Sequence, residues 1–447
     1  MKRRTFLSLP VACGALAQAR HPNIVVLLAD DLGWADVGYH GSEIQTPHLD
    51  RLARQGSQLD RFYSFPVCSP TRSGLMTGRS PMRYGVMYSV VRPWLDYGLP
   101  TDEHILPQSL KAAGYETAIT GKWHLGHSQA KYLPTSRGFD HAYGHVNGAI
   151  DYFSHERDGG LDWHRDGKSV REEGYSTDLL AAEAVRLIRR RDRAKPLFLY
   201  TPFNAPHAPL QAPPRLIEKY AAIADPRRRT FAAMVDALDT AIGRVLAALD
   251  EEKMTEDTLV LFCSDNGGPL NQGARNTPLR GAKATTFEGG IRVPAILRWP
   301  GRVKEGAKSA QVMTMLDVFP TLAAAAGVTP QNKLPFDGKN LWPALQGGQA
   351  ESREDLFFAV EAGARTYLAV RRGEWKLVQE DGTNHLFRIE DDPNETNNLA
   401  AQHPELVRDL AGRIERWKAL YPPGGIHESS RPPSGWKAPP LWAEAAK

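Results

Sequence analysis

The chain has 447 residues, of which 42% are hydrophobic and 24% are charged. These values are ordinary for a globular protein, argue against intrinsic disorder and leave room for two domains. The net charge of +4 arises from 55 basic and 51 acidic residues. Such a balance gives no case for nucleic acid or an anionic membrane surface as a partner.

Residues 1–19 have the pattern of an export signal. Basic residues occupy positions 2–4, an apolar run follows, and residues 17–19 (AQA) resemble a cleavage site. The twin arginine is typical of a signal that exports folded protein, and a Sec-type signal is the other route. A buried first strand is the alternative, but Pro10 and the charged start suit a strand poorly. We therefore expect a periplasmic or secreted protein. Because no later apolar run is long enough to span a bilayer, we expect no transmembrane segment in the mature chain.

Four short apolar runs predict an α/β domain. They cover residues 23–29, 116–120, 196–200 and 259–263 and alternate with helical patterns, which favours a large, mostly parallel sheet flanked by helices. Polar, potentially reactive residues follow each run. Since ligands of open α/β sheets bind at the carboxyl ends of the strands, we expect the functional site along that edge.

Helical patterns fill the gaps between these runs. The clearest covers residues 229–252, where apolar side chains repeat at three- and four-residue steps. Thr46 and Pro47 are a plausible cap and first residue of another helix. Both helices are expected to pack one face against the sheet.

Apolar runs separated by turn residues after about residue 350 predict a small antiparallel sheet, followed by a helix near residues 404–417. The runs cover residues 356–360, 367–370 and 375–378. The predicted divisions of the chain are an export signal at 1–19, a main α/β domain at 20–350 and a C-terminal subdomain with its tail at 351–447.

Four oxygen donors follow two of the predicted strands, namely Asp30, Asp31, Asp265 and Asn266. Carboxylate and amide oxygens suit a hard cation, Ca²⁺ better than Zn²⁺. The alternative is that both pairs simply form turns. Two adjacent acids directly after a buried strand are costly unless a cation pairs with them, so we expect a metal site.

Basic residues form a second candidate group on the same strand ends and nearby segments. Such a cluster suits a tetrahedral oxyanion, because arginine offers forked hydrogen bonds and lysine a point charge. Any single histidine could be structural, but His124 and His207 can also transfer protons near neutral pH. The members of this group are Arg72, Arg79, Lys122, His124, His207 and Lys283.

The chain has three cysteines, and Cys68 is the one that needs an explanation. Cys13 lies in the expected signal, and Cys263 lies in an apolar run where cysteine acts as a small hydrophobic residue. In an exported protein a disulfide between Cys68 and Cys263 is an alternative. A soft thiolate fits poorly beside a hard cation, and a cysteine nucleophile is usually activated by a neighbouring histidine.

The segment 68–72 (CSPTR) matches the Cys-x-Pro-x-Arg signature of type I sulfatases, and residues 73–79 (SGLMTGR) match its usual extension. The chain therefore resembles this family over nearly its whole mature length. Further matches follow in chain order at residues 29–33 (ADDLG), 121–126 (GKWHLG), 265–268 (DNGG), 279–283 (LRGAK) and 288–294 (EGGIRVP).

The resemblance implies an alkaline-phosphatase-like α/β sandwich and a modified Cys68. In the family a formylglycine-generating or sulfatase-maturating enzyme oxidises this cysteine to Cα-formylglycine, whose hydrate attacks the sulfur of a sulfated substrate. One Ca²⁺ would be bound by Asp30, Asp31, Asp265 and Asn266 together with the modified Cys68.

The resemblance also implies roles for the basic residues. Arg72 and Lys122 would orient the hydrate, and His124 would assist its proton transfers. His207 and Lys283 would hold the sulfate, and one of them would protonate the leaving sugar oxygen. The expected activity is that of a sulfuric ester hydrolase acting on sulfated carbohydrate.

Two stretches outside these motifs, residues 133–140 and 151–157, resemble the arylsulfatase B or N-acetylgalactosamine-4-sulfatase type. They favour exo-acting removal of sulfate from 4-sulfated N-acetylgalactosamine or galactose. Specificity is expected in loops around Trp94, residues 151–157, His164 and Trp436.

Two alternatives to a sulfatase stay open. The first is a phosphonate monoester or phosphodiester hydrolase of the same superfamily, which can share the formylglycine motif. The second is a non-catalytic protein that binds sulfated glycans. Loss of Cys68, Arg72 or a metal carboxylate would favour the second, and none is lost.

Overall fold

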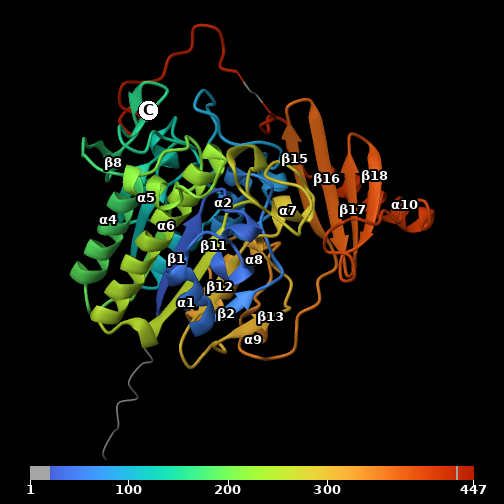
Figure 1. Ribbon diagram of the computed structural model, residues 1–447, viewed down its shortest axis with the longest axis horizontal. Helices are drawn as coiled ribbons and strands as arrows, with labels where there is room; N and C mark the ends of the chain where they lie inside the picture. Colours follow the sequence, from blue (N-terminus) through green and yellow to red (C-terminus); the bar gives the residue numbers. More distant parts are fainter. Residues whose placement is uncertain (1–20, 429–430, 447) are drawn as a thin grey trace, which may run out of the picture.

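A ten-stranded mixed sheet forms the centre of the computed structural model, which describes residues 21–428 and 431–446 (Figure 1). The predicted export signal and Cys13 lie outside the described residues. In order across the sheet the strands are β13 (Ala307–Ser309), β2 (Ser57–Leu59), β12 (Ala295–Arg298), β11 (Thr258–Ser264), β1 (Asn23–Ala29), β10 (Leu197–Pro202), β4 (Glu116–Lys122), β5 (His141–His145), β8 (His164–Arg165) and β9 (Lys168–Ser169).

The five middle strands, β11 to β5, pair in parallel, and antiparallel pairs join them to β12 and β8. The four predicted apolar runs are β1, β4, β10 and β11, so they all lie in this parallel part. Their burial on both faces explains why they read as continuous apolar segments. The predicted mostly parallel sheet is confirmed for the centre, and its edges are antiparallel or short.

Helices cover both faces of the sheet, as predicted. Val25, Leu27 and Ala29 of β1 belong to one core cluster, and Ile24, Val26 and Leu28 to the other, because successive side chains of a strand point to opposite faces. The first face carries α1 (Pro47–Gln55), α4 (Ser176–Arg190), α5 (Pro214–Lys219) and α6 (Pro226–Glu251). The second carries α2 (Cys68–Thr77), α3 (Leu106–Ala112), α8 (Met315–Ala325) and α9 (Trp342–Leu345).

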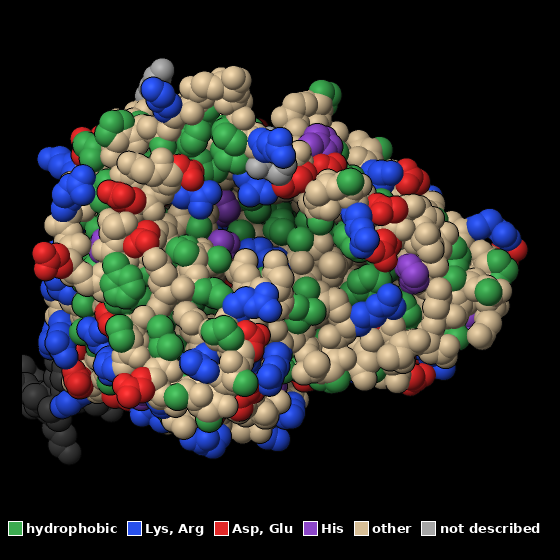
Figure 2. All heavy atoms as spheres, turned by 45° about the horizontal axis from the view of Figure 1, so that its top comes forward, with side chains coloured by type: hydrophobic (Ala, Val, Ile, Leu, Met, Phe, Trp, Pro, Cys, Tyr) green, Lys and Arg blue, Asp and Glu red, His purple; other side chains and the backbone are tan. Residues whose placement is uncertain are grey.

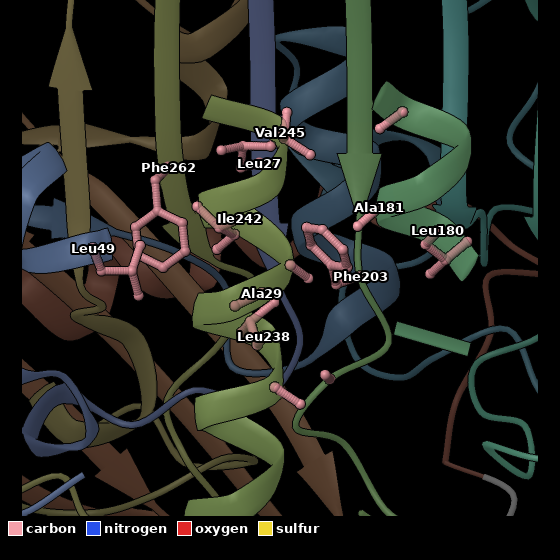
Figure 3. Packing of buried hydrophobic residues seen from close by; sticks show 14 of the residues in the cluster. Leu27, Ala29, Leu49, Leu180, Ala181, Phe203, Leu238, Ile242, Val245 and Phe262 are labelled. Atoms are coloured by element: carbon pink, nitrogen blue, oxygen red, sulfur yellow. The ribbon is translucent and has the colours of Figure 1, made fainter. Parts of the chain in front are cut away.

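Helix α6 shows how the first face packs. Leu238, Ile242 and Val245 lie one turn apart and point toward Leu27 of β1 and Phe262 of β11 (Figure 3). The helix begins three residues before the predicted start of its apolar pattern. Asp225 caps its N-terminus by accepting a hydrogen bond from the Arg227 amide, and Pro226 suits the first helical position.

The C-terminal part forms a four-stranded antiparallel sheet, where three strands were predicted. The fourth strand, β18, carries only two fully buried side chains, Leu386 and Phe387, and so has a weak apolar pattern. Helix α10 packs on this sheet and matches the helix predicted near residues 404–417. In order the elements are β15 (Leu356–Ala362), β16 (Arg365–Arg372), β17 (Trp375–Glu380), β18 (Thr383–Arg388) and α10 (Pro404–Lys418).

The small sheet packs on the segment that leads into α2, since Phe65 and Val67 share a core cluster with Phe358. A fully buried ion pair adds to this contact, because Lys376 of β17 lies 2.9 Å from Glu288 of α7 (Glu288–Ile291). The predicted domain boundary at residue 350 stays a prediction. The remaining strands are β3 (Phe62–Tyr63), β14 (Met313–Thr314), β6 (Glu156–Arg157) and β7 (Gly160–Leu161).

No helix among residues 21–428 and 431–446 is both long and apolar enough to cross a membrane. Cys68 and Cys263 are both buried free thiols, so the alternative of a disulfide between them is wrong for this structure.

Candidate active site

The predicted oxygen donors meet because two neighbouring strands end together. Ala29 of β1 is the register partner of Ser264 of β11. Asp30 and Asp31 follow the first strand, and Asp265 and Asn266 follow the second. The Asp265 amide donates to the Ala29 carbonyl at 3.0 Å, which extends the parallel ladder by one step and sets the two pairs side by side.

These four side chains are fully buried and contact one another. Carboxylate oxygens of Asp30, Asp31 and Asp265 lie within 4.8 Å of one another. Asn266 Nδ2 donates to Asp31 Oδ1 at 2.7 Å. Asp31 also has a φ of 70°, a left-handed conformation that is costly for a residue other than glycine and typical of functional sites.

Three basic side chains hold this acidic group. Lys122, at the end of β4, donates from Nζ to Asp30 Oδ2 at 2.6 Å. Arg72 of α2 donates from Nη1 to the Lys122 carbonyl at 2.9 Å and reaches Asp265 with two other nitrogens. Lys283 Nζ lies 2.6 Å from Asp31 Oδ1. The formal charges of the three acids and the three bases cancel, so charge balance alone does not require a cation.

Two buried oxygens of the cluster nevertheless have no hydrogen-bond partner among the described residues, Asp30 Oδ1 and Asn266 Oδ1. A buried oxygen without a partner loses the free energy of hydration and gains nothing in return. A hard cation accepts a carboxylate and an amide oxygen as ligands. The four residues therefore fit Ca²⁺, and the unpartnered oxygens are the observation that supports it.

Cys68 is the first residue of α2 and lies beside this cluster. Its Sγ, an oxygen of Asp30 and a ring nitrogen of His207 lie within 4.8 Å of one another. Burial raises the pKa of the Cys68 thiol, although the charges of Lys122 and Lys283 oppose that effect. An unmodified thiol here stays protonated at neutral pH and is a poor nucleophile.

His124 is buried and held in one orientation. Its Nε2 donates to the Val91 carbonyl at 3.0 Å, which leaves Nδ1 as the unprotonated nitrogen of the neutral ring. That Nδ1 is buried and has no partner among the described residues. Burial, reinforced by the charges of Lys122 and Arg72, holds the pKa of His124 well below its usual range. The ring is therefore neutral, and its Nδ1 can accept a hydrogen bond.

His207 lies on the other side of the cluster. Its Nδ1 donates to the Ala208 carbonyl at 2.6 Å, and its Nε2 lies 3.6 Å from Asp31 Oδ2. Burial and the charge of Lys283 lower the pKa of His207, and the charge of Asp31 opposes them.

Arg79 does not join the site, although the sequence grouped it there. It lies beyond the end of α2 and pairs with Glu103, with Nε 2.8 Å from the carboxylate. Gly78, with a φ of 66°, ends the helix, and the chain turns away at that point. Arg79 is therefore a structural residue in this fold.

The cluster lies beneath a cavity of about 600 Å³ whose lining includes Cys68, His124, His207 and Lys283. Figure 2 shows this hollow, with histidine and basic side chains gathered inside it. Of the predicted specificity residues, Arg157 lines the cavity, whereas Trp94 packs against Trp436 with ring centroids 5.9 Å apart. His164 is buried on β8.

Three charged residues of the cavity wall were missed by sequence reasoning, namely Arg92, Glu361 and Glu428. They come from segments far apart in the chain and carry no local motif. Only their mutual contacts in the folded chain reveal them.

Comparisons with known proteins give the family of this chain. The family model described as Sulfatase matches residues 22–328, and the model of the C-terminal part of N-sulphoglucosamine sulphohydrolase matches residues 282–419. Arylsulfatase J of Mus musculus is 33% identical, over 91% of this chain and 78% of its own length. N-acetylgalactosamine-6-sulfatase of Homo sapiens is 35% identical, over 81% of this chain and 72% of its own length.

A solved structure, Ps i-CgsB in complex with k-i-k-neocarrahexaose, shares 34% identity. It covers 92% of this chain and 96% of its own, with a TM-score of 0.87, which confirms the predicted alkaline-phosphatase-like α/β fold. The sequence relatives and the family model together decide the classification. The chain belongs to the sulfatase family and is a sulfuric ester hydrolase.

Proposed function

We propose that this protein is an exported, exo-acting carbohydrate sulfatase whose substrates carry 4-sulfated N-acetylgalactosamine or galactose. The observation that carries the proposal is the cavity floor, where Cys68 lies between buried carboxylates and basic groups suited to a sulfate ester. A carbohydrate substrate is supported by two similar proteins, one named an N-acetylgalactosamine-6-sulfatase and one solved with a neocarrahexaose. The arylsulfatase B-like stretches at 133–140 and 151–157 favour the 4-sulfate.

The proposal includes two groups that the family uses. Ca²⁺ would be held by Asp30, Asp31, Asp265 and Asn266 and would supply positive charge beside the sulfate oxygens. Cα-formylglycine, made from Cys68 by a maturating enzyme, would supply a hydrated aldehyde with two hydroxyl groups in place of one thiol.

The chain's own residues would then orient the reactants and move protons. Arg72 and Lys122 fix the cluster around residue 68, and their charges oppose negative charge that builds up on the sulfate. His124, a neutral ring with an unpartnered Nδ1, would accept a hydrogen bond from the hydrate and assist its proton transfers. His207 and Lys283 would hold the sulfate, and one of them would return a proton to the sugar oxygen as it leaves.

Localisation and domain division also stand as proposals. The export signal at residues 1–19 would direct the protein to the periplasm or outside the cell. The main unit at 20–350 would carry the catalytic cluster, and the unit at 351–447 would complete the cavity wall.

The deciding experiment measures sulfate release from a panel of monosulfated sugars that includes N-acetylgalactosamine 4-sulfate, N-acetylgalactosamine 6-sulfate and galactose 4-sulfate. We expect the 4-sulfates to be preferred and Cys68→Ala to abolish release. Cys263→Ala is the matched control, since it removes the other buried thiol and should keep activity. Full activity of Cys68→Ala would contradict the mechanism.

The same assay separates the two alternatives. Hydrolysis of a phenyl phosphonate monoester or a phosphodiester in preference to every sulfated sugar would favour the phosphonate or phosphodiester hydrolase. Binding of sulfated sugars without release of sulfate, by protein in which residue 68 is converted, would favour the non-catalytic binding protein.

A further inference from the structure

The C-terminal segment, residues 421–428 and 431–446, passes from the small sheet back to the main sheet and is anchored at both ends. Near its start, the Ile426 amide donates to the Gly85 carbonyl at 2.7 Å. Near its end, the Leu161 amide donates to the Pro440 carbonyl at 2.9 Å and the Trp442 amide to the Leu161 carbonyl at 3.0 Å. Figure 1 shows the segment in red, arching over the carboxyl edge of the sheet toward β8.

Between these anchors the segment places Glu428 in the cavity wall. The Glu428 carboxylate accepts hydrogen bonds from Ser89 Oγ at 2.9 Å and from Arg92 Nη2 at 2.7 Å. The Glu428 amide donates to a carboxylate oxygen of Glu361 at 2.8 Å. The carboxylates of Glu361 and Glu428 thus lie on one wall of the cavity, and the Glu428 carboxylate is paired with the guanidinium group of Arg92.

Arg92 belongs to a segment that also contacts the catalytic centre. The next residue back, Val91, accepts from His124 Nε2 at 3.0 Å and donates to Ser69 Oγ at 3.0 Å. Glu428 therefore holds the segment that fixes His124 and the neighbour of Cys68. A substrate on the cavity floor would have this wall beside it.

Both arginines of the cavity wall are already paired with carboxylates. Among the described lining residues, the ionisable ones away from the floor are Arg92, Arg157, Glu361 and Glu428, and their formal charges cancel. Arg157 Nε donates to Asp158 at 3.0 Å, so neither arginine is free. At the floor, Lys283 and the proposed Ca²⁺ would attract one sulfate, whereas a second anionic group at the wall would compete with Glu428 for Arg92 and be repelled by two carboxylates. Sugar hydroxyl groups can instead donate to those carboxylates.

We propose that Glu428, through its pairing with Arg92, is a specificity-determining residue that selects a sugar with one sulfate and no other charged group. The same sugar with a second sulfate or a carboxylate would be disfavoured. This inference rests on the proposed function and defines its substrate class more narrowly.

The test compares Glu428→Gln and Arg92→Gln, which act on the same ion pair from opposite sides. Glu428→Gln frees Arg92 to bind an anion, and Arg92→Gln leaves Glu428 as an uncompensated carboxylate. The readout is the ratio of kcat/KM for N-acetylgalactosamine 4-sulfate to that for the 4,6-disulfate. We expect Glu428→Gln to lower the ratio about fivefold and Arg92→Gln to raise it by a similar factor. A purely structural role would change the ratio in the same direction in both variants, or leave it unchanged.

Glu444→Gln is the matched control, because Glu444 lies on the same segment and accepts from the Ser169 amide at 2.9 Å, away from the cavity. It should leave the ratio unchanged. The ratio of dissociation constants for the two sugars, measured by calorimetry in a Cys68→Ala background, gives the same comparison without turnover. A binding ratio that moves in opposite directions in the two variants, while protein that keeps a converted residue 68 releases no sulfate, would refute the proposed function and keep this inference. Sulfate release with a ratio that is equal in wild type and Glu428→Gln would refute this inference alone.

Discussion

The guanidinium group of Arg72 donates to a single carboxylate oxygen of Asp265 from two nitrogens, Nε at 3.0 Å and Nη2 at 2.7 Å, and both side chains are fully buried. A third nitrogen of Arg72 reaches the Lys122 carbonyl. One side chain therefore joins helix α2 to the ends of β11 and β4, within the buried charged cluster.

Arg72→Lys should lower kcat/KM at least about 100-fold, because one ammonium group cannot replace the three contacts of a fixed guanidinium fork. Arg72 also belongs to the conversion signature, so activity is expressed per chain in which mass spectrometry finds residue 68 converted. Arg79→Lys, which changes an arginine that pairs with Glu103 away from the site, is the control. Parental activity per converted chain in Arg72→Lys would show that Arg72 has no role in positioning.

Removal of Ca²⁺ should destabilise the protein as well as inactivate it, because the metal would bind only the folded cluster. At a free Ca²⁺ concentration 100-fold above Kd, the stabilisation is about 2.7 kcal/mol. A chelator should therefore lower the melting temperature, and added Ca²⁺ but not Mg²⁺ should restore it.

Asp30→Asn should lose this Ca²⁺-dependent shift. Asp317→Asn is the matched control, since Asp317 is a buried carboxylate that pairs with Arg353 away from the site. Asp317→Asn should lower the melting temperature and retain the Ca²⁺-dependent change in melting temperature. A shift of equal size in Asp30→Asn would count against the assignment of Asp30 as a ligand.

Gly148→Ala should impair catalysis through His124. A Cβ at position 148 would lie 2.5 Å from Cε1 and Nε2 of the imidazole, so the ring must move and its hydrogen bond to Val91 must lengthen. Misplacement of a catalytic group by a fraction of an ångström is expected to lower kcat about tenfold. Gly412→Ala, in helix α10, is the control and should leave kcat unchanged, because an added Cβ there meets only a side-chain nitrogen of Arg416 at 3.5 Å. Unchanged kcat in Gly148→Ala would show that the orientation of His124 does not limit the reaction.

Glu183 should make stability depend on pH in the acid range. Burial alone would raise the pKa of Glu183, but hydrogen bonds from Arg186, His141 and Arg165 outweigh it and hold that pKa well below its usual range. Because the folded-state pKa lies below the unfolded value of about 4.3, the stabilisation is complete above that pH and is lost as the pH falls through the folded-state pKa.

Glu183→Gln should therefore lower the free energy of unfolding by about 2 kcal/mol at neutral pH, and the difference from wild type should shrink in acid. Denaturant titrations at a neutral and an acid pH measure this difference. Asp178→Asn, on the same helix in an exposed pair with Arg244 at 3.6 Å, is the control and should change the free energy of unfolding by less than about 1 kcal/mol at neutral pH. A difference that grows as the pH falls would contradict the sign of the shift.

The carboxylate cluster could be predicted from the sequence because its position depends on local features. Strands β1 and β11 are continuous apolar runs, and once they pair in parallel the residues after each run must meet. This pairing alone brings together the four oxygen donors, Asp30, Asp31, Asp265 and Asn266, and it does not depend on the rest of the tertiary fold. Lys122 joins them by the same rule at the end of β4.

The cavity wall could not be predicted in this way. Glu428 and Arg92 are 336 residues apart, and neither belongs to an apolar pattern or a turn signal. Their pairing depends on how the C-terminal segment crosses the molecule, which is a property of the tertiary fold. For Arg79 the sequence predicted a site residue that the structure does not place in the site. Its closeness to Arg72 in the chain suggested a shared site, but Gly78 has a left-handed conformation and directs the following residues away from the carboxylate cluster.

Every one of the ten residues of α2 is buried, from Cys68 to Thr77. The Cys68 side chain faces the cavity, but a second protein could not bind the backbone of the 68–72 signature while α2 is packed against α8. The proposed conversion of Cys68 would therefore have to occur on a nascent or unfolded chain. The time of this conversion would depend on the export route. A pathway that carries folded protein would require conversion before transport, in the compartment of synthesis. A pathway that carries unfolded chains would allow conversion on either side of the membrane.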